Sequence, residues 1–215
     1  MATPTGPLLS FGASGTLGKT IVFSKWKGRP YVRRHVVPAN PQTAAQTLTR
    51  NAFGFASNLW KSAPTLLRTP WVRFAQGQVL SARNAFIGKN TAILRPEVDI
   101  LLWIGSPGAK GGLAPLTAVL TPTSQGFTVA VTAPAVPTGW TLTAAVSAAL
   151  ESQNPQTGVD FLITAADEDP FSSPVTLTGL KALTAYTVAT WLVWTKPDAS
   201  LAYGAALNDT DTTLA

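Results

Sequence analysis

The stretch Tyr186–Thr195, YTVATWLVWT, is dense in β-branched and aromatic residues and decides the fold expected for the C-terminal half. Residues of these types favour strands. Seven such runs follow residue 112, and turn-forming residues separate them. They are Thr117–Thr121, Phe127–Thr132, Trp140–Ala148, Asp160–Thr164, Pro174–Leu177, Tyr186–Thr195 and Leu201–Leu207. Short alternating strands at this spacing predict an all-β sandwich of two sheets over residues 113–215.

A pattern of alternate residues indicates which type of sandwich to expect. The pattern consists of Leu180, Ala182, Thr184, Tyr186 and Val188. This set of residues resembles the Leu-x-Pro-x-Thr-x-Tyr-x-Val pattern of fibronectin type III modules, with Ala182 at the usual proline position. The resemblance implies that Tyr186 packs at the corner between the sheets and hydrogen-bonds the backbone through its hydroxyl. Trp140 or Trp191 would fill the core tryptophan position. The expected fold of this half is therefore an immunoglobulin-like or fibronectin-like sandwich.

Upstream of this half, residues 105–112 (GSPGAKGG) predict a flexible linker. Helices are expected before it. Asn40 and Pro41 predict a helix start, as N-cap and first helical residue, for a helix over 41–62. Its apolar stripe is Leu48, Ala52, Phe55, Leu59 and Ala63. A second helical region is expected from Thr69-Pro70, with Gly77 as a candidate break. Its expected core residues are Trp71, Phe74, Val79, Ala82, Phe86, Ile87, Ile93 and Leu94.

The N-terminal part predicts a β-hairpin that follows a loose arm. Residues 1–18 are rich in Gly, Pro, Ser and Thr and predict an extended arm. Residues 19–26 and 29–37 alternate in the manner of two strands, with a glycine-containing turn between them. The expected fold class is thus an α+β domain over 19–104, with a hairpin and helices, followed by the all-β sandwich.

Charge divides the sequence unevenly. Residues 1–110 contain fourteen Lys or Arg and two acids, and no acid precedes Glu97. Residues 111–215 contain two Lys and eight acids. The formal charges are therefore +12 and −6, which give the chain's net +6. Such asymmetry indicates two modules with different partners, of which the basic one faces something anionic.

Residue types that commonly form catalytic and metal sites are scarce in this sequence. The chain has no cysteine, and His35 is its single histidine, so thiolate sites and histidine triads are excluded. Ala13–Thr20 (ASGTLGKT) fits a relaxed phosphate-loop pattern, but the residues after it alternate as a strand, whereas a phosphate loop opens a helix. Asp167-Glu168-Asp169 lacks the spacing of a calcium loop and predicts a solvated turn. We expect no enzyme activity, no cofactor and no metal. No apolar run predicts a membrane span or a secretion signal.

Basic and aromatic residues of the hairpin form the main candidate site. They are Lys19, Lys25, Trp26, Lys27, Arg29, Tyr31, Arg33 and Arg34. In one interpretation they follow a nucleic-acid backbone while the aromatic rings stack on bases. In another they are a solvated strand face with core aromatics. In the third, which we favour, they dock onto an acidic protein surface in an assembly.

A second resemblance concerns residues 12–95. The segment GKTIVFSKWKGRPYVR (18–33), followed by NPQTAAQ (40–46), resembles a signature of small proteins encoded among the virion genes of tailed bacteriophages. Asn84-Ala-Phe86 and Asn90 fit the same pattern. The resemblance implies a structural protein of the capsid, head–tail neck or tail, made in the host cytoplasm and located in the virion. Its expected partners are virion proteins with acidic surfaces and further copies of itself in a symmetric assembly. A nucleic-acid-binding protein and a host-surface or carbohydrate-binding adhesin are the alternatives.

Overall fold

The computed structural model describes residues 14–27, 29–94, 103–151 and 163–215. The chain divides into two compact units, Met1–Gln42 and Thr43–Ala215. We call the first the hairpin unit and the second the body. The described residues contain three helices and a larger number of strands, and these strands pair only in the antiparallel sense, so the regular structure of the described part is mostly β. The predicted combination of helices with a larger number of antiparallel strands is confirmed.

The hairpin unit is a small antiparallel sheet in the order β1-β2-β3. Its strands are β1 (Gly15–Leu17), β2 (Ile21–Trp26) and β3 (Arg29–Arg34). The predicted hairpin is therefore present, although its second strand ends at Arg34. The predicted arm is wrong at its end, because positive φ angles at Gly18 and Lys19 turn the chain back and pair β1 with β2. Residues 1–13 of that arm lie outside the described part of the chain.

The first helix of the body, α1 (Ala44–Ser62), begins three residues later than expected. Thr43 is its N-cap, and its hydroxyl accepts a hydrogen bond from the Gln46 N–H at 3.4 Å. The cap predicted at Asn40 is wrong, because Gln42 has a positive φ that helical backbone does not adopt. The predicted stripe is confirmed at its C-terminal end, where Ala52, Phe55, Leu59 and Ala63 are buried.

Two further helices follow, α2 (Thr65–Ala75) and α3 (Ala82–Leu94). The start predicted at Thr69 is wrong, since α2 starts at Thr65 and contains Pro70. Gly77 lies between the helices with φ +85°, so the expected break is confirmed. Six of the eight predicted core residues pack in the core, whereas Val79 is exposed between α2 and α3 and Ile93 is half-buried outside the core cluster.

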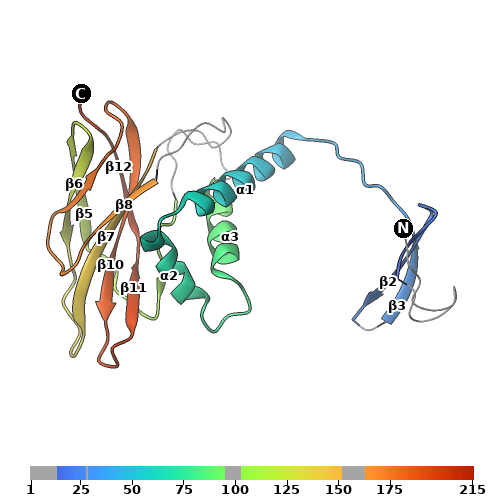
Figure 1. Cartoon of the computed structure of the whole chain (residues 1–215), viewed down its shortest axis with the longest axis horizontal. Coiled ribbons are helices and arrows are strands. Elements are labelled where there is room, and N and C mark those ends of the chain that lie inside the picture. The colour runs from blue at the N-terminus through green and yellow to red at the C-terminus, as the bar shows by residue number, and fades with distance from the viewer. Residues whose placement is uncertain (1–13, 28, 95–102, 152–162) are drawn as a thin grey trace. The chain divides into compact units, whose positions relative to one another are not determined.

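The strands of the body form two sheets (Figure 1). The large sheet has the order β4-β11-β10-β7-β8, and β12 also pairs with β10. Its strands are β4 (Pro107–Ala109), β7 (Thr141–Glu151), β8 (Ile163–Glu168), β10 (Ala185–Thr195), β11 (Leu201–Ala205) and β12 (Leu207–Thr212). The small sheet has the order β5-β6-β9, with β5 (Thr117–Thr123), β6 (Gly126–Thr132) and β9 (Val175–Thr178).

One hydrophobic core lies between the two sheets. Phe127 and Leu177 of the small sheet share it with Tyr186 and Trp194 of the large sheet. The ring centroids of Phe127 and Tyr186 lie 6.1 Å apart in an edge-to-face arrangement, which is a favourable aromatic geometry. The sheets are therefore joined face to face through this core.

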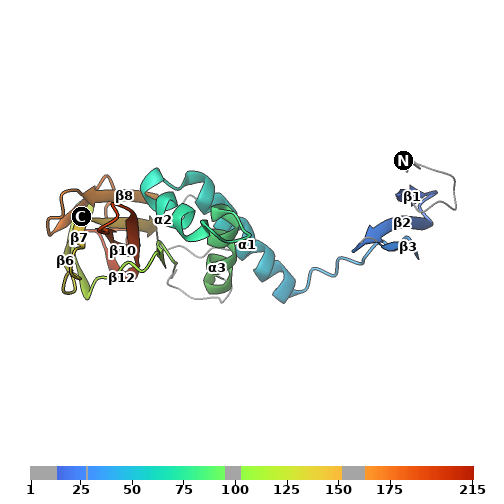
Figure 2. The ribbon, with the colours of Figure 1, turned by 90° about the horizontal axis from the view of Figure 1, so that it is seen from below.

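A second core lies on the other face of the large sheet, where the helices pack (Figure 2). Val146, Trp191 and Val193 contribute to it from the sheet, and the helices contribute Trp71 and Phe86. Nine consecutive residues of β10 and eight of β7 are buried as a result. The large sheet is covered on both faces, so the helices and both sheets form one packed body.

Residues 105–112, predicted as a linker, belong to this body. Pro107–Ala109 form β4, which pairs with β11. The indole N–H of Trp71 donates a hydrogen bond to the Gly105 carbonyl oxygen at 2.8 Å. A Cβ atom on Gly105 would lie 2.8 Å from the Cβ of Ala189. The linker prediction is wrong because glycine permits close packing at this position.

The domain boundaries predicted at 18/19 and around 105–112 are corrected accordingly. The expected docking domain over residues 19–104 is divided at Gln42, because its hairpin separates from its helices. The helices instead share a core with strands β7 and β10. The expected sandwich over 113–215 therefore does not stand apart from the helical segment.

The contact expected of Tyr186 is present. Its side chain is buried in the core between the sheets, and its hydroxyl accepts a hydrogen bond from the Lys181 N–H at 3.0 Å. The substitution Tyr186→Phe removes the acceptor and leaves that N–H without its partner. We expect the free energy of unfolding to fall by about 1–2 kcal/mol, measured by urea denaturation. Tyr31→Phe, at an exposed ring of the hairpin unit, is the control and should cause no loss; equal stability of Tyr186→Phe and wild type would contradict the assigned role.

Candidate docking surface

The backbone register of the hairpin unit assigns six of the eight predicted docking residues to two faces, and the other two, Lys19 and Lys27, lie in turns at the ends of β2. Residues directly opposite each other in an antiparallel pair lie on the same face. Ser24 is opposite Tyr31, Val22 is opposite Arg33, and Trp26 is opposite Arg29. Trp26, Tyr31 and Arg33 therefore share one face, which we call the cationic–aromatic face, and position 29 lies on the same side by backbone register.

Trp26 is the most prominent residue of the cationic–aromatic face. Its side chain is 66% exposed, and the Lys27 ammonium lies 4.7 Å from the centroid of its ring. An exposed tryptophan ring that already holds a cation over its face can also bind a cationic or apolar group of a partner. Exposed Trp, Tyr and Arg are also the residue types most enriched at interface hot spots. This face consequently has the composition of a binding surface.

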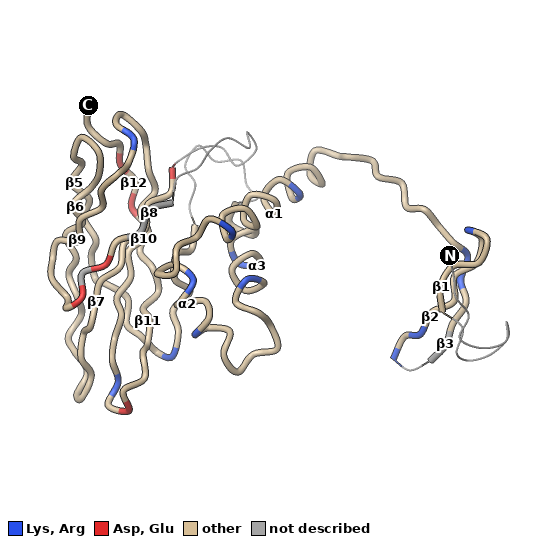
Figure 3. The backbone as a smooth tube through the Cα atoms, viewed as in Figure 1, with Lys and Arg blue, Asp and Glu red and all other residues tan. Residues whose placement is uncertain are grey.

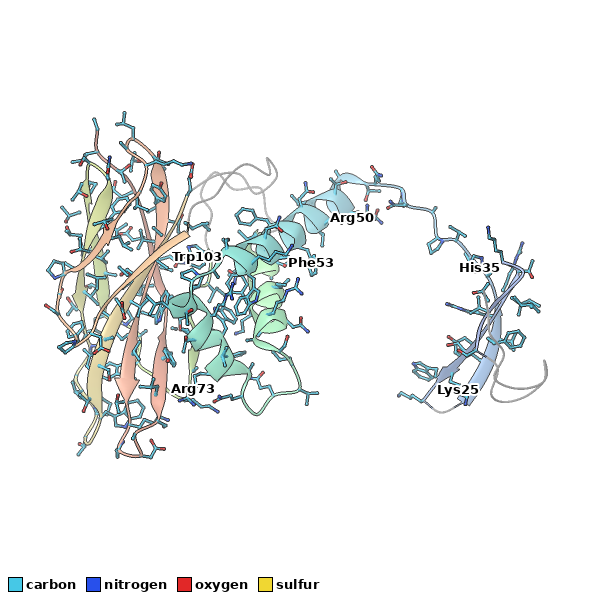
Figure 4. The ribbon with its side chains drawn as sticks, in the orientation of Figure 1. Lys25, His35, Arg50, Phe53, Arg73 and Trp103 are labelled. Carbon is cyan, nitrogen blue, oxygen red and sulfur yellow. The ribbon has the colours of Figure 1, made fainter. Side chains whose placement is uncertain are left out.

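The opposite face of the same sheet is apolar. Phe23 is opposite Val32, and Ile21 is opposite both Leu17 and Arg34. We call Leu17, Ile21, Phe23 and Val32 the apolar face. Two further predicted docking residues, Lys25 and Arg34, lie at opposite ends of this face, and Figure 4 shows Lys25 and His35 at the two ends of the hairpin unit. Composition groups the eight residues together, whereas the strand register divides six of them between the two faces.

The hairpin unit has no core of its own within its described residues. None of residues 14–27 and 31–42 is buried. A sheet of three short strands needs a covered apolar face to offset the loss of chain entropy. Within residues 14–27 and 31–42 no side chain supplies such a covered face.

His35 does not belong to a catalytic cluster in the described residues. Its backbone N–H donates to the Thr20 carbonyl oxygen at 2.7 Å and extends the pairing of β2 and β3. With Arg33 and Arg34 it lines an open hollow of about 550 Å³. Across the described ranges, no group of three or more His, Asp and Glu side chains could hold a metal ion.

The remaining sequence motifs have structural explanations. The described part of the phosphate-loop pattern, residues 14–20, covers β1 and a turn, and strand β2 follows it, so residues 14–26 contain no helix that could receive a phosphate. Asp167 and Glu168 are the last residues of β8, so the predicted turn starts only after them. Asp167 and Asp169 are both exposed.

The body has an open groove of about 540 Å³ between α1 and α3. Phe53, Ile87 and Gly88 line it together with Arg83, and Figure 4 labels Phe53 there. Its lining contains neither an acidic residue nor a histidine, so it provides no acid–base pair. None of the helices in the described segments is long and apolar enough to cross a membrane.

Comparisons with known proteins identify no relative by sequence. No family model matches this chain, and no curated protein matches it. Among solved structures, one titled "Myokine structure" is similar over 49% of this chain and 100% of its own, with 11% identity and a TM-score of 0.37. That likeness is too low to support an inference about function.

Proposed function

We propose that this chain is a non-enzymatic structural protein of a tailed-bacteriophage virion. It docks through the cationic–aromatic face of its hairpin unit and presents the body at the particle surface. The observation that carries the proposal is the hairpin unit itself, whose described residues include no buried one and whose cationic–aromatic face exposes Trp26, Tyr31 and Arg33. An element of this kind gains its stability on binding.

The partner surface is expected to be acidic protein. The hairpin unit contains Lys19, Lys25, Lys27, Arg29, Arg33 and Arg34 and no acid. Complementary charge speeds encounter and suppresses wrong partners. Several copies on one symmetric particle would add avidity to a modest single contact.

The body fits the role of the presented part. We assign its two sheets to an immunoglobulin-like or fibronectin-like sandwich, supported by the hydrogen bond between Lys181 and Tyr186. Figure 3 shows acids on the sheets and bases on the hairpin unit and helices. Both lysines downstream of residue 110 have a contact in the body, because Lys181 pairs with Glu151 and Lys196 lies over the Trp140 ring. Because residues 111–215 contain eight acids and only these two lysines, this part of the body is net acidic, unlike the hairpin unit.

A particle-binding experiment tests the proposal. Particles assembled without this protein are mixed with purified chain and sedimented. Trp26→Ala should weaken binding by about thirtyfold, the effect of losing about 2 kcal/mol at an interface hot spot. Phe53→Ala removes an aromatic ring that is 55% exposed on the body and should leave binding unchanged. If both variants bind like wild type, the hairpin unit is not the docking element.

Single-stranded nucleic acid is a second candidate partner, because the same face combines exposed aromatic rings with a guanidinium group. Binding of this kind weakens steeply with salt. A gel shift with single-stranded DNA at low and moderate salt distinguishes the candidates. Retardation at low salt that Trp26→Ala abolishes would favour nucleic acid over acidic protein.

A further inference from the structure

The hollow lined by Arg33, Arg34 and His35 lies at the end of the cationic–aromatic face that is remote from Trp26. Figure 4 labels His35 at this end of the hairpin unit. We propose that the hollow is a carboxylate-binding subsite, which receives an Asp or Glu side chain of the docking partner. The inference rests on the proposed function and deepens it, because it assigns the chemical group recognised at this end of the face and a dependence on pH.

Strand register brings side chains of all three strands to this hollow. Thr16 of β1 is opposite Val22 of β2, and Val22 is opposite Arg33 of β3, so the three form one row on the cationic–aromatic face. The backbone N–H of His35 donates to the Thr20 carbonyl oxygen and continues the pairing of β2 with β3. Because His35 follows Arg33 by two residues, its imidazole lies on the same side. A hydroxyl, a guanidinium and an imidazole group therefore line the hollow together.

These three groups match the acceptors of a carboxylate. A guanidinium group can donate two parallel hydrogen bonds to the two oxygens of one carboxylate. An imidazole N–H and a threonine hydroxyl each provide one further donor. The hairpin unit contains no acid, so Arg33 and His35 have no carboxylate partner within it. The hollow is therefore expected to take its carboxylate from the docking partner.

The distribution of charge along the face favours a carboxylate over the phosphates of a nucleic acid. Arg33 lies at one end, and Lys27 lies beside Trp26 at the other, about 14 Å away along the strands. The pair between them, Ser24 and Tyr31, is uncharged. A nucleic-acid strand carries a charge at every nucleotide and would place phosphates over this uncharged middle as well. A protein surface can present carboxylates at the two ends alone.

His35 should make this contact dependent on pH. Arg33 and Arg34 are the charged groups that line the hollow with it, and the lining residues from β1 and β2, Thr16 and Val22, do not titrate. A histidine side chain changes its charge between about pH 5 and 8. The protonated imidazole donates a charge-assisted hydrogen bond, which is stronger than that of the neutral ring. Its contribution to carboxylate binding is therefore present at low pH and is lost as the pH rises.

Fluorescence anisotropy of labelled decaglutamate with the full chain at low salt tests the inference. Arg33→Lys keeps the charge but loses the two parallel hydrogen bonds, so binding at about pH 6 should weaken by about fivefold. Arg83→Lys makes the same change at an exposed arginine of α3 and should leave binding within about twofold. The wild type should bind about threefold more tightly at about pH 6 than at about pH 8, and His35→Gln should remove this difference.

Several outcomes would overturn the inference. They are equal affinity of the wild type and Arg33→Lys, an unchanged pH difference in His35→Gln, and a labelled oligothymidine whose binding these variants weaken more than they weaken that of decaglutamate. The last result would identify phosphate as the ligand of the hollow. Particle binding that depends on Trp26 could persist in each case, so the subsite can fail while the proposed function stands. Conversely, decaglutamate binding that depends on Arg33 in a chain that does not bind particles would support the subsite and contradict the proposed docking.

Discussion

A fragment that begins at residue 103 should fail to fold, although it contains every strand of both sheets. Without α1–α3, one face of the large sheet would expose Val146, Leu150, Trp191 and Val193 together with Trp103. Burial of each such side chain contributes about 1.5–3 kcal/mol. The five together contribute on the order of 10 kcal/mol, which is comparable with the whole stability of a domain.

Circular dichroism, thermal unfolding and gel filtration measure this effect. The fragment 103–215 should aggregate or lack a cooperative transition, because large exposed apolar patches promote association. The fragment 43–215 is the matched control and should unfold in one cooperative transition. A monomeric 103–215 fragment that melts cooperatively near the temperature of 43–215 would show that the sheets form an independent domain.

Trp71→Ala should be among the most destabilising single substitutions in the body, at about 3–5 kcal/mol. The Trp71 side chain is fully buried, and its ring centroid lies 5.2 Å from that of Phe86 in an edge-to-face arrangement. Its indole N–H donates to the Gly105 carbonyl oxygen. Truncation therefore leaves a cavity and also removes the hydrogen-bond donor to the Gly105 carbonyl oxygen.

Guanidinium denaturation of the full chain measures the loss. Val72→Ala, at the next position on α2 and exposed to solvent, is the control and should change stability by less than about 1 kcal/mol. A loss below about 1 kcal/mol for Trp71→Ala would contradict the packing of α2 against the large sheet.

The sequence predicted local structure more accurately than it predicted packing. Strands such as β6 and β10 and the buried end of α1 follow from residue type and period. The burial of β10 on both faces was missed, although the run Ala189–Trp194 is nearly continuous in apolar residues and a strand with one solvated face would alternate. Strand β12 was missed because Leu207–Thr212 is mostly polar, and its place in the sheet depends on pairing with β10.

The glycines of residues 105–112 are compatible either with a flexible connection or with close packing of the backbone. Residues 105–112 have the composition of a flexible connection, and composition alone does not distinguish flexibility from close approach. The distinction depends on Ala189 and Trp191, which are distant in sequence and lie too near Gly105 for a side chain there. The charge boundary near residue 110 suggested the same division, but the structural boundary follows Gln42.

The candidate site was predicted in composition but not in geometry. All eight candidate residues belong to the hairpin unit, yet Trp26 and Arg33 lie on one face and Arg34 at an end of the other. A hairpin turn fixes register, so the positions flanking Lys27-Gly28 contained the information for this assignment. The absence of a buried residue among those described in the unit depends on tertiary structure and could not be read from the residues.

Hydrogen exchange of β2 and β3, measured in the free chain and on the particle, tests the central claim most directly. A sheet without a core opens at low free-energy cost, so its amides should exchange rapidly in the free chain at concentrations too low for self-association. On the particle these amides should become protected, while those of β7 and β10 exchange slowly in both states. Equal exchange of β2 and β3 in the two states would contradict docking through the hairpin unit.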